Sequence, residues 1–452
     1  EQYWRILVGP WLLQFIGIFY ERYKRIENAI RLFPDFCTCT ISEQRCNVVS
    51  KNTSDFVRYK INNDFYNLSL FSFIINNLYP KRTKKIDDNF KLKTDDFPPT
   101  FSWKGKLFEE FLKALNVFFK SPIILSDMLH LNKNDMLFLS LKSGVNTVNF
   151  RHFTPLGDRH HINDLSLGLR GKLINHQEAS NKFLSLLHKI LPHTIPTCYI
   201  ENYEFYRNEI KDLASVKVIG SAVGWVFNER LKFFAAEAAS KGSKIIEFQH
   251  GGGYGLSLAD LPEELALEKD IFYTWGWSLK EKNNKIRLLP NPHLSKLKDK
   301  YNLKLDNPLM VGVNMPRYHF RFGNYFFPDD MPKYFADKKI FFSCLYDEIK
   351  KRLLYRPSIY EYGWGEKELI KQEVPNVKFV ENGRLPDLMK KVKLVIIDHC
   401  HTSFLEALTI NVPCVLYWDH DIYLMRPEAE PYFEELRRAN VLFKDPLSAS
   451  KQ

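Results

Sequence analysis

The sequence predicts an α/β protein with two Rossmann-like units in series and a helical, irregular N-terminal elaboration. The chain has 452 residues, more than one ordinary hydrophobic core accommodates, so two domains are expected. Between residues 216 and 275, short apolar runs alternate with an amphipathic helical run, as in a doubly wound parallel sheet. The same alternation starts again after Pro290-Asn291-Pro292 and continues to residue 418.

The N-terminal part is the least regular. Residues 6–20 form its most apolar stretch, but these 15 residues are fewer than the ~20 that a membrane-spanning helix needs. They also lack the basic start and the small-residue cleavage site of a signal peptide, so we expect a buried helix. Residues 51–100 are rich in Asn, Asp and Lys and predict loops or a small excursion from the first domain. Apolar spacing predicts amphipathic helices over 103–118 and 181–191, the second ended by Pro192.

The elements of the two units follow from the apolar runs and the residues that interrupt them. In the first unit we expect strands at 216–220, 244–248 and 271–275, and a helix at 228–241 that ends at Gly242. In the second unit we expect strands at 309–314, 377–380, 394–398 and 412–418, a long helix within 335–354, and helices at 385–391, 401–409 and 427–439. The predicted domains are 1–305, with the helical additions, and 306–452, with a closing helix.

Composition narrows the class of protein. Hydrophobic residues make up 45% of the chain and charged residues 26%, which excludes a disordered or collagen-like protein. The chain has 64 Lys and Arg against 53 Asp and Glu, a formal charge of +11 that is spread along the sequence. This charge indicates an anionic partner: nucleic acid, a membrane surface or a phosphorylated substrate. Nucleic acid is disfavoured, because the basic residues form no stripe interleaved with aromatics and no nucleic-acid-binding module is recognised.

The cysteines indicate a reducing compartment. There are seven, and an odd number without regular spacing is a poor disulfide framework, so we expect a cytoplasmic protein. Cys37, Cys39 and Cys46 lie close together in the sequence, but no second pair or His cluster follows at zinc spacing. We therefore expect no metal site.

The first loop with candidate chemistry is 249–255, directly after the strand expected at 244–248. Ligands of open α/β sheets bind at the carboxyl ends of strands, where this loop lies. Its residues include Gln249, His250, Gly251 and Gly252, and glycines allow close backbone approach to a ligand. The pattern matches neither a dinucleotide fingerprint nor a P-loop. His250 is a candidate general base, or a hydrogen-bond donor to a phosphate or carboxylate. The alternative is a structural histidine bonded to a backbone carbonyl.

The second loop is 398–406. Thr402 and Ser403 lie where the helix expected at 401–409 begins, so their hydroxyls and free backbone N–H groups predict an anion site. Glu406 falls one turn later on the same side. The alternative is a plain capping box between Ser403 and Glu406. The preceding Asp398, His399 and His401 complete the candidate phosphate-binding set of this loop.

Smaller features also fit a nucleotide crevice. Tyr362 and Trp364 offer aromatic faces for stacking on a base, although such side chains more often pack in cores. Glu229, at the start of the helix expected at 228–241, is a candidate base. The alternative is that Glu229 and the neighbouring Arg230 take part in a surface ion pair. His293 and Arg426 are two further candidate ligand contacts. For His293 the alternative is a simple turn.

Several motifs together resemble one family. They are Tyr3-Trp4, Gly9-Pro10-Trp11-Leu12, Tyr20-Glu21-Arg22-Tyr23, the run from Gln249 to Gly255, Thr274-Trp275-Gly276-Trp277, Tyr362-Gly363-Trp364-Gly365 and the run from Asp398 to Leu408. As a set they resemble the LIC12162-type transferases of bacterial surface-polysaccharide loci, across nearly the whole chain. More distantly, the two-unit layout is similar to GT-B transferases with cytidine-activated donors, namely the Kdo transferases and the teichoic-acid glycerophosphotransferases.

The resemblance implies a GT-B-like fold, with two Rossmann-like domains facing a central cleft. It implies the acceptor on the side of 1–305 and the nucleotide-sugar donor on the side of 306–452, with His250 at the reaction centre and Thr402 and Ser403 on the donor phosphate. Cys400-His401 departs from the small residues or proline expected there. The acidic-Asp-Gly motif of some Kdo and sialic-acid transferases is absent, so the resemblance assigns no catalytic carboxylate.

These observations predict a metal-independent glycosyltransferase of lipopolysaccharide O-antigen or capsule synthesis. It would transfer an ulosonic or nonulosonic acid, Kdo or a pseudaminic-type acid, from a CMP-linked donor to a lipid-linked saccharide. His250 is expected to perform acid/base work, with Glu229 a weaker candidate base or nucleophile. We expect metal-independent transfer, in which basic side chains and a helix N-terminus take the place of a cation, and so no cofactor besides the nucleotide-sugar co-substrate.

Two alternatives stay open. A CDP-alditol phosphotransferase would use the same phosphate loop, and a non-catalytic glycan- or lipid-binding protein would use the basic charge alone. For the leading prediction, the partners are the nucleotide sugar, the lipid-linked acceptor and the anionic inner face of the plasma membrane, with a cytoplasmic, peripheral location.

Overall fold

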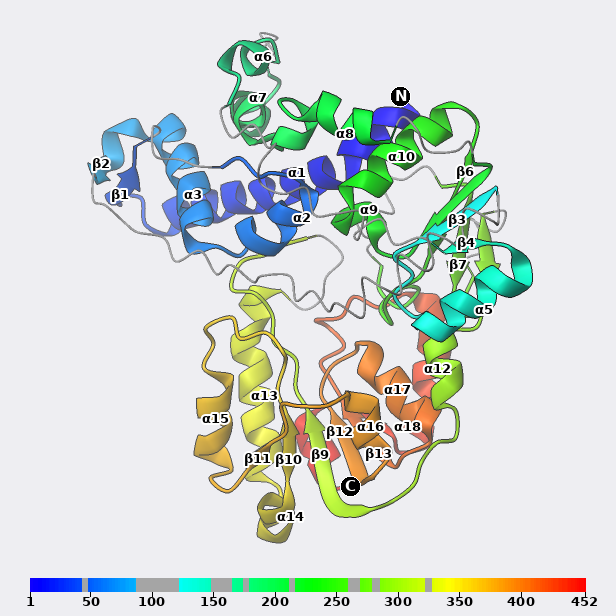
Figure 1. Cartoon of the computed structure of the whole chain (residues 1–452). Helices are drawn as coiled ribbons and strands as arrows, with labels where there is room; N and C mark the ends of the chain where they lie inside the picture. The colour runs from blue at the N-terminus through cyan, green and yellow to red at the C-terminus, as the bar shows by residue number, and fades with distance from the viewer. Residues whose placement is uncertain are drawn as a thin grey trace. The chain divides into compact units, whose positions relative to one another are not determined.

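The computed structural model describes residues 1–42, 48–86, 122–147, 165–173, 179–210, 216–258, 269–278, 285–321 and 327–452 (Figure 1). It contains two six-stranded sheets and many helices, so the predicted α/β, Rossmann-like class is confirmed. The chain divides into two compact units. The first is mainly Glu1–Phe248, and the second is mainly Gln249–Asp260, Phe272–His319 and Gly323–Gln452. The predicted domain boundary between residues 305 and 306 stays a prediction.

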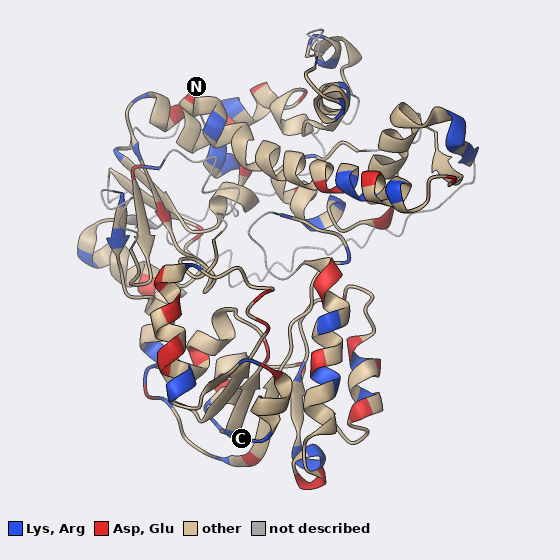
Figure 2. Cartoon of the chain, turned by 180° about the vertical axis from the view of Figure 1, so that it is seen from behind, with Lys and Arg blue, Asp and Glu red and all other residues tan. Residues whose placement is uncertain are grey.

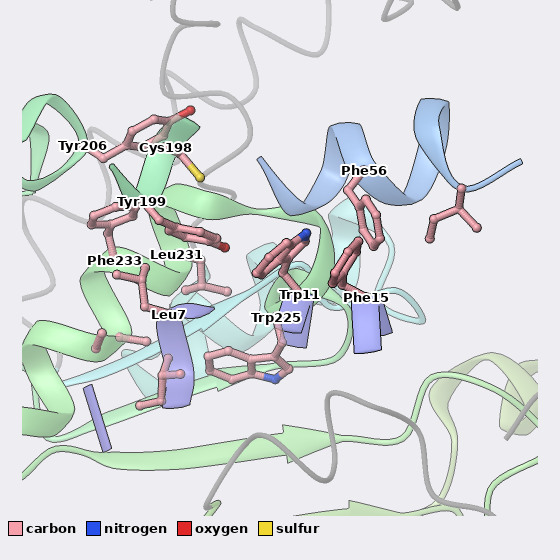
Figure 3. Packing of buried hydrophobic residues seen from close by; sticks show 14 of the residues in the cluster. Leu7, Trp11, Phe15, Phe56, Cys198, Tyr199, Tyr206, Trp225, Leu231 and Phe233 are labelled. Atoms are coloured by element: carbon pink, nitrogen blue, oxygen red, sulfur yellow. The ribbon is translucent and has the colours of Figure 1, made fainter. Parts of the chain in front are cut away.

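A long helix, α1 (Gln2–Leu32), organises the core of the first unit. Leu7, Trp11 and Phe15 recur every four residues on one face of α1 and are fully buried, so the expected buried helix at 6–20 is confirmed. They pack in one cluster with Leu231 and Phe233 of α10 (Glu229–Ser240), as Figure 3 shows. The rings of Trp11 and Phe15 stack with their centroids 5.4 Å apart.

The described part of 51–100, residues 51–86, is mainly helical and ends in the strand β2 (Thr83–Ile86), so loops as the main structure there are wrong. Asn63 accepts a hydrogen bond from the backbone N–H of Tyr66 and caps α3 (Asp64–Leu78). Tyr66 and Leu70 then continue a buried stripe at helical spacing, which the many Asn and Asp residues conceal in the sequence. The helix expected at 181–191 is α7 (Lys182–Thr194), but the predicted end at Pro192 is wrong, because Pro192 lies inside the helix, which continues to Thr194. The helix expected at 103–118 lies outside the described residues.

The N-terminal part contains further short elements. They are the strands β1 (Thr38–Ile41) and β2 (Thr83–Ile86), which pair in parallel, and the helices α2 (Thr53–Asp55), η2 (Phe56–Lys60), η3 (Pro80–Arg82), α5 (Lys133–Ser143), α6 (Leu167–Gly171), η6 (Thr197–Tyr199), α8 (Tyr203–Glu209) and α9 (Gly224–Phe227).

The first large sheet has the strand order β4-β3-β5-β6-β7-β8. Its strands are β3 (Ile123–Ser126), β4 (Asn146–Thr147), β5 (Val218–Ser221), β6 (Lys244–Phe248), β7 (Ile271–Thr274) and β8 (Ile286–Leu288). β6 has the predicted bounds, and β5 and β7 lie within two residues of theirs, while β3, β4 and β8 were not predicted. From β3 the chain continues to β4 on one side and then to β5 on the other, so the strand order reverses between β3 and β5. These two strands pair in parallel.

The second sheet is entirely parallel and has the order β11-β10-β9-β12-β13-β14. Its strands are β9 (Leu305–Val311), β10 (Leu354–Arg356), β11 (Lys378–Phe379), β12 (Val392–Ile397), β13 (Cys414–Tyr417) and β14 (Leu442–Phe443). Counted within the unit, this order is 3-2-1-4-5-6, that of dinucleotide-binding folds. The order reverses between β9 and β12, and Val311, Ile397 and Leu416 lie side by side at the carboxyl edge. The ligand crevice of such a sheet is expected at that reversal.

The helices of the second unit largely follow the predicted pattern. They are α12 (Pro292–Leu297), η8 (Pro328–Asp330), α13 (Met331–Ser343), α14 (Asp347–Arg352), α15 (Glu366–Glu373), α16 (Leu385–Met389), α17 (Thr402–Ile410), η9 (Pro427–Ala429), α18 (Glu430–Arg438) and α19 (Pro446–Ser450). The long helix expected within 335–354 is α13, which begins earlier, at Met331, and stops at Ser343. A second, short helix, α14, follows it with Asp347 and Glu348 in its first turn.

Charged residues of both signs are interspersed along the helices, as Figure 2 shows, in keeping with the spread of charge in the sequence. The described cysteines, all but Cys46, are free thiols. Within the described ranges, no helix combines the length and the apolar character that crossing a bilayer requires.

The α1 core gives a stability prediction. Replacing Phe15 by Ala leaves a cavity in a fully buried cluster and is expected to lower the free energy of unfolding by about 3–5 kcal/mol. The matched control is Phe33→Ala directly after α1, where the ring is 67% exposed and the change should be small. Urea unfolding followed by circular dichroism measures both, and equal losses would contradict this account of the core.

Candidate active site

The carboxyl end of β12 carries the densest polar cluster of the second sheet. Asp398 follows the last strand residue and is 3% exposed. Its Oδ1 accepts a hydrogen bond from the Tyr334 hydroxyl at 2.9 Å, and its Oδ2 lies 2.7 Å from the Lys338 ammonium. Both partners come from α13, so the ion pair ties this helix to the end of the strand.

The ionisation of Asp398 is set by these neighbours. Burial alone would raise the pKa of its carboxyl, but the Lys338 ammonium and the hydrogen bond with His399 outweigh burial and hold the pKa below its ordinary value. The carboxylate is therefore charged in the folded protein at neutral pH. A buried charge of this kind persists only with paired and hydrogen-bonded partners.

The cluster continues away from the strand end. Lys338 Nζ also donates to the Tyr355 hydroxyl at 2.7 Å, and that hydroxyl donates to Glu366 Oε1 at 2.5 Å. Burial raises the pKa of Glu366, against the opposing effect of Lys338. A side chain at position 312, directly after β9, would collide with the Tyr355 hydroxyl, so this position next to the cluster requires glycine.

His399 connects Asp398 to the start of α17. Its Nδ1 lies 3.1 Å from Asp398 Oδ1, and its Nε2 lies 2.8 Å from the Ser403 hydroxyl. An imidazole held by a carboxylate on one side presents a fixed nitrogen on the other. Ser403 is 9% exposed, so its hydroxyl is oriented rather than freely rotating.

The helix start differs from the alternative considered from sequence. The N-cap of α17 is His401, and no side chain caps this helix, so the capping box between Ser403 and Glu406 is wrong. Glu406 Oε1 instead lies 2.7 Å from His293 Nε2, which brings together two residues predicted separately. The first-turn backbone N–H groups of α17 thus have no side-chain cap.

Gln249 holds the glycine-rich loop in place. Its carboxamide Oε1 accepts hydrogen bonds from the backbone N–H of Trp275 and from the indole of Trp277, both at 2.8 Å. Its Nε2 donates to the carbonyl of Gly251 at 2.8 Å. With its side chain 3% exposed and bonded on both atoms, Gln249 fits a positioning role rather than direct ligand binding.

The two predicted loops meet at Gly252. Its backbone N–H donates to Thr402 Oγ1 at 3.0 Å. A Cβ at this position would lie 2.9 Å from the Cα of Thr402, so only glycine allows the approach. In the same loop the Tyr254 hydroxyl lies 2.9 Å from Nδ1 of His250, which is half-buried. The loop that carries His250 therefore lies directly against the first turn of α17.

The remaining predicted residues of the second unit lie in its loops. The Trp364 indole donates to the carbonyl of Met315 at 2.7 Å, and Tyr362 lies beside Tyr360 with its pKa raised to about 12 by burial. Arg426 donates its backbone N–H to the carbonyl of Leu256 at 2.7 Å, beyond the glycine loop.

Glu229 belongs to the first unit. Its carboxylate accepts hydrogen bonds from the backbone N–H of Thr53 and the hydroxyl of Tyr199, both at 2.9 Å, and lies 3.1 Å from the Lys232 ammonium. These contacts, at 6% exposure, fit a structural role in the helical core. A role as base or nucleophile stays a prediction.

Two residues escaped the sequence analysis. Asp127 follows β3 at the reversal of the first sheet with a φ of 52°, and its Oδ2 accepts from Asn228 at 2.7 Å. Asn314 follows β9 at the reversal of the second sheet and is 5% exposed. The available signal was a polar residue at the end of an apolar run, directly after Val313 for Asn314 and one residue after Ser126 for Asp127. β3 was not predicted at all, and the strand predicted at 309–314 absorbed Asn314.

Across the described residues, no group of three or more His, Cys, Asp or Glu side chains is arranged to hold a metal ion.

One comparison with known proteins identifies a family. The model of the LIC12162 family transferases matches residues 1–452. No curated protein matches the chain.

The buried ion pair predicts a pH-dependent stability. The pKa of Asp398 is lower in the folded than in the unfolded chain, so its stabilisation is complete above the unfolded value of about 4 and is lost as the pH falls through the folded value. Asp398→Asn leaves Lys338 unpaired and should cost about 3–5 kcal/mol at pH 7. Below about pH 4 the difference from the wild type should narrow.

Urea unfolding at pH 7, 5 and 3.5 measures this difference. The matched control is Asp306→Asn, which removes an exposed carboxylate paired with Lys393 and Arg352 and should change stability little. A cost for Asp398→Asn that is small, or constant over this pH range, would show that the ion pair does not stabilise the site.

Proposed function

The chain belongs to the LIC12162 family of transferases, and we propose that it is a glycosyltransferase of bacterial surface-polysaccharide synthesis. The proposed reaction transfers an ulosonic or nonulosonic acid, of the Kdo or pseudaminic type, from a CMP-linked donor to a lipid-linked saccharide. The single observation that supports it most is the contact of the His250 loop with the start of α17, through the Gly252 N–H and Thr402 hydroxyl.

The donor phosphate is assigned to the first turn of α17. Uncapped backbone N–H groups and the positive end of the helix dipole favour an anion there. Thr402 and Ser403 add hydroxyls at the same turn. His399 Nε2 lies 2.8 Å from the Ser403 hydroxyl and holds it in orientation at this turn.

His250 is assigned the proton transfer. In the proposed step the acceptor hydroxyl oxygen forms a bond to the anomeric carbon of the donor sugar and gives its proton to His250. The bond from that carbon to the phosphate oxygen breaks, and its electron pair leaves with CMP. The Tyr254 hydroxyl, 2.9 Å from Nδ1, holds the imidazole in orientation. Stabilising the negative charge on the departing phosphate at α17 lowers the barrier further, in addition to the proton transfer to His250.

Transfer of an alditol phosphate from a CDP-linked donor is the second candidate function. It is favoured by the same anion site, because the helix N-terminus and the two hydroxyls would serve a diphosphate as well. The products differ, since this reaction adds a phosphodiester to the acceptor rather than a sugar alone.

The proposed function predicts nucleotide binding. Of a panel of CMP-, CDP-, UDP- and GDP-sugars, the CMP-sugars should raise the melting temperature of the purified wild type most. Ser403→Ala should weaken CMP binding about tenfold by removing one hydrogen bond to a charged group. His250→Ala should retain binding and lose about 10²–10⁴ in turnover.

The control is Ser343→Ala at the exposed end of α13, which should behave as the wild type. Product mass spectrometry separates sugar transfer from alditol-phosphate transfer. The proposal fails if no nucleotide sugar stabilises the wild type and His250→Ala turns over at the wild-type rate.

The net charge predicts a second behaviour. With a formal charge of +11, the protein should bind vesicles that contain anionic phospholipid and should be released as salt is raised from about 50 to 500 mM, because surface charges are then screened. Co-sedimentation measures this, with neutral phosphatidylcholine vesicles as the control. Binding that is indifferent to both lipid charge and salt would contradict an electrostatic association.

A further inference from the structure

We propose that Asn314 is a nucleotide-recognition residue, whose carboxamide pairs with adjacent donor and acceptor atoms on the edge of the nucleobase. This inference rests on the proposed use of a nucleotide-linked donor and goes beyond it by assigning the base contact. Nothing in the motif pattern of the sequence singles out this residue, because it stands at the end of an apolar run.

The side chain of Asn314 is buried without a protein partner. The residue is 5% exposed, and neither Oδ1 nor Nδ2 forms a hydrogen bond with any described residue. More than nine-tenths of buried polar groups in proteins are bonded, and a buried carboxamide with both atoms unpaired is costly to keep. Such an exception at a sheet edge is typical of a group kept for a ligand.

The position of Asn314 is the second argument. It lies three residues beyond Val311, the last residue of β9, which pairs with Ile397 of β12. The strand order reverses between these two strands, and a sheet of this order binds its nucleotide outside their carboxyl ends. The helix after β12, α17, carries Ser403 in its first turn, so the residues proposed for base and phosphate follow the two strands of one reversal.

The surroundings suit a flat ring. The Trp364 indole donates to the carbonyl of Met315, the residue after Asn314, at 2.7 Å. A Cβ at Gly363 would lie 3.4 Å from Arg317 Nε, so the aromatic loop after β10 runs along the segment that carries Asn314. An aromatic side chain near a carboxamide offers both a stacking face and a hydrogen-bonding edge.

The chemistry of the carboxamide selects the ligand group. A phosphate offers only acceptors and would leave Oδ1 unpaired, so it does not match Asn314. The amide presents one acceptor beside two donors, which matches the exocyclic amine and ring nitrogen of cytosine. Adjacent sugar hydroxyls offer the same donor and acceptor pair, and the experiment below separates them from the base.

The test measures binding of CMP, cytidine and ribose 5-phosphate to the full chain by calorimetry. Asn314→Ala should weaken CMP and cytidine alike, by about tenfold to a hundredfold, and leave ribose 5-phosphate unchanged. Asn376→Ala, at an exposed position of the same unit, is the matched control and should change none of the three. Equal weakening of ribose 5-phosphate would move the contact to the sugar and overturn the base assignment.

A second variant separates binding from folding. Asn314→Leu keeps the side-chain size and removes both unpaired polar atoms, so the ligand-free protein should melt no lower than the wild type while CMP binding is lost. A large drop in its melting temperature would show that the carboxamide is structural and overturn the inference. If the wild type binds CMP and Asn314→Ala binds it equally, only this inference fails. If the wild type binds no nucleotide, the proposed function falls, and this inference falls with it.

Discussion

The ion pair between Asp398 and Lys338 is the interaction on which the carboxyl edge of the second sheet depends. It joins the end of β12 to α13 in a place where neither charge has contact with water. Because a buried charge without its partner is strongly unfavourable, the strand end, the helix and the tyrosines that complete their hydrogen bonds must assemble together. α17 starts four residues after Asp398, so the ion pair also fixes where this helix begins.

The first unit contains a comparable arrangement with a different consequence. Lys232, Glu229 and Tyr199 form a buried cluster in which all contacts stay within the helical core. In the second unit the corresponding Lys338, Asp398 and Tyr334 stand at a strand end and extend to His399 and Ser403. The same residue types therefore hold helices together in one unit and orient a potential ligand group in the other. Position relative to the sheet, and not residue chemistry alone, separates the two roles.

The sequence predicted well what short-range patterns determine. The apolar run at 244–248 is β6 to the residue, and the polar run after 394–398 is the start of α17. It failed at Leu354-Tyr355-Arg356, a strand of three residues that follows helix-forming residues and is held in the sheet by pairing with β9 and β11. That pairing is a long-range contact, which local periodicity does not contain.

The candidate site shows the same division. Both loops were predicted from their positions after strands, but their contact at Gly252 and the burial of Glu229 depend on tertiary packing. Asn314 shows the limit most clearly, because its distinguishing property is a missing hydrogen bond among the described residues, which exists only once the chain is folded.

The close approach of Gly252 to Thr402 also makes two distant parts of the chain depend on each other. A side chain at 252 would have to push back the first turn of α17, and a shift of that turn would in turn release the loop that carries His250. A single methyl group is thus enough to uncouple the residue proposed to accept the proton from the helix proposed to receive the phosphate. The proposed proton transfer at His250 and the proposed phosphate site at α17 therefore depend on one backbone contact, and a change to either segment affects the other.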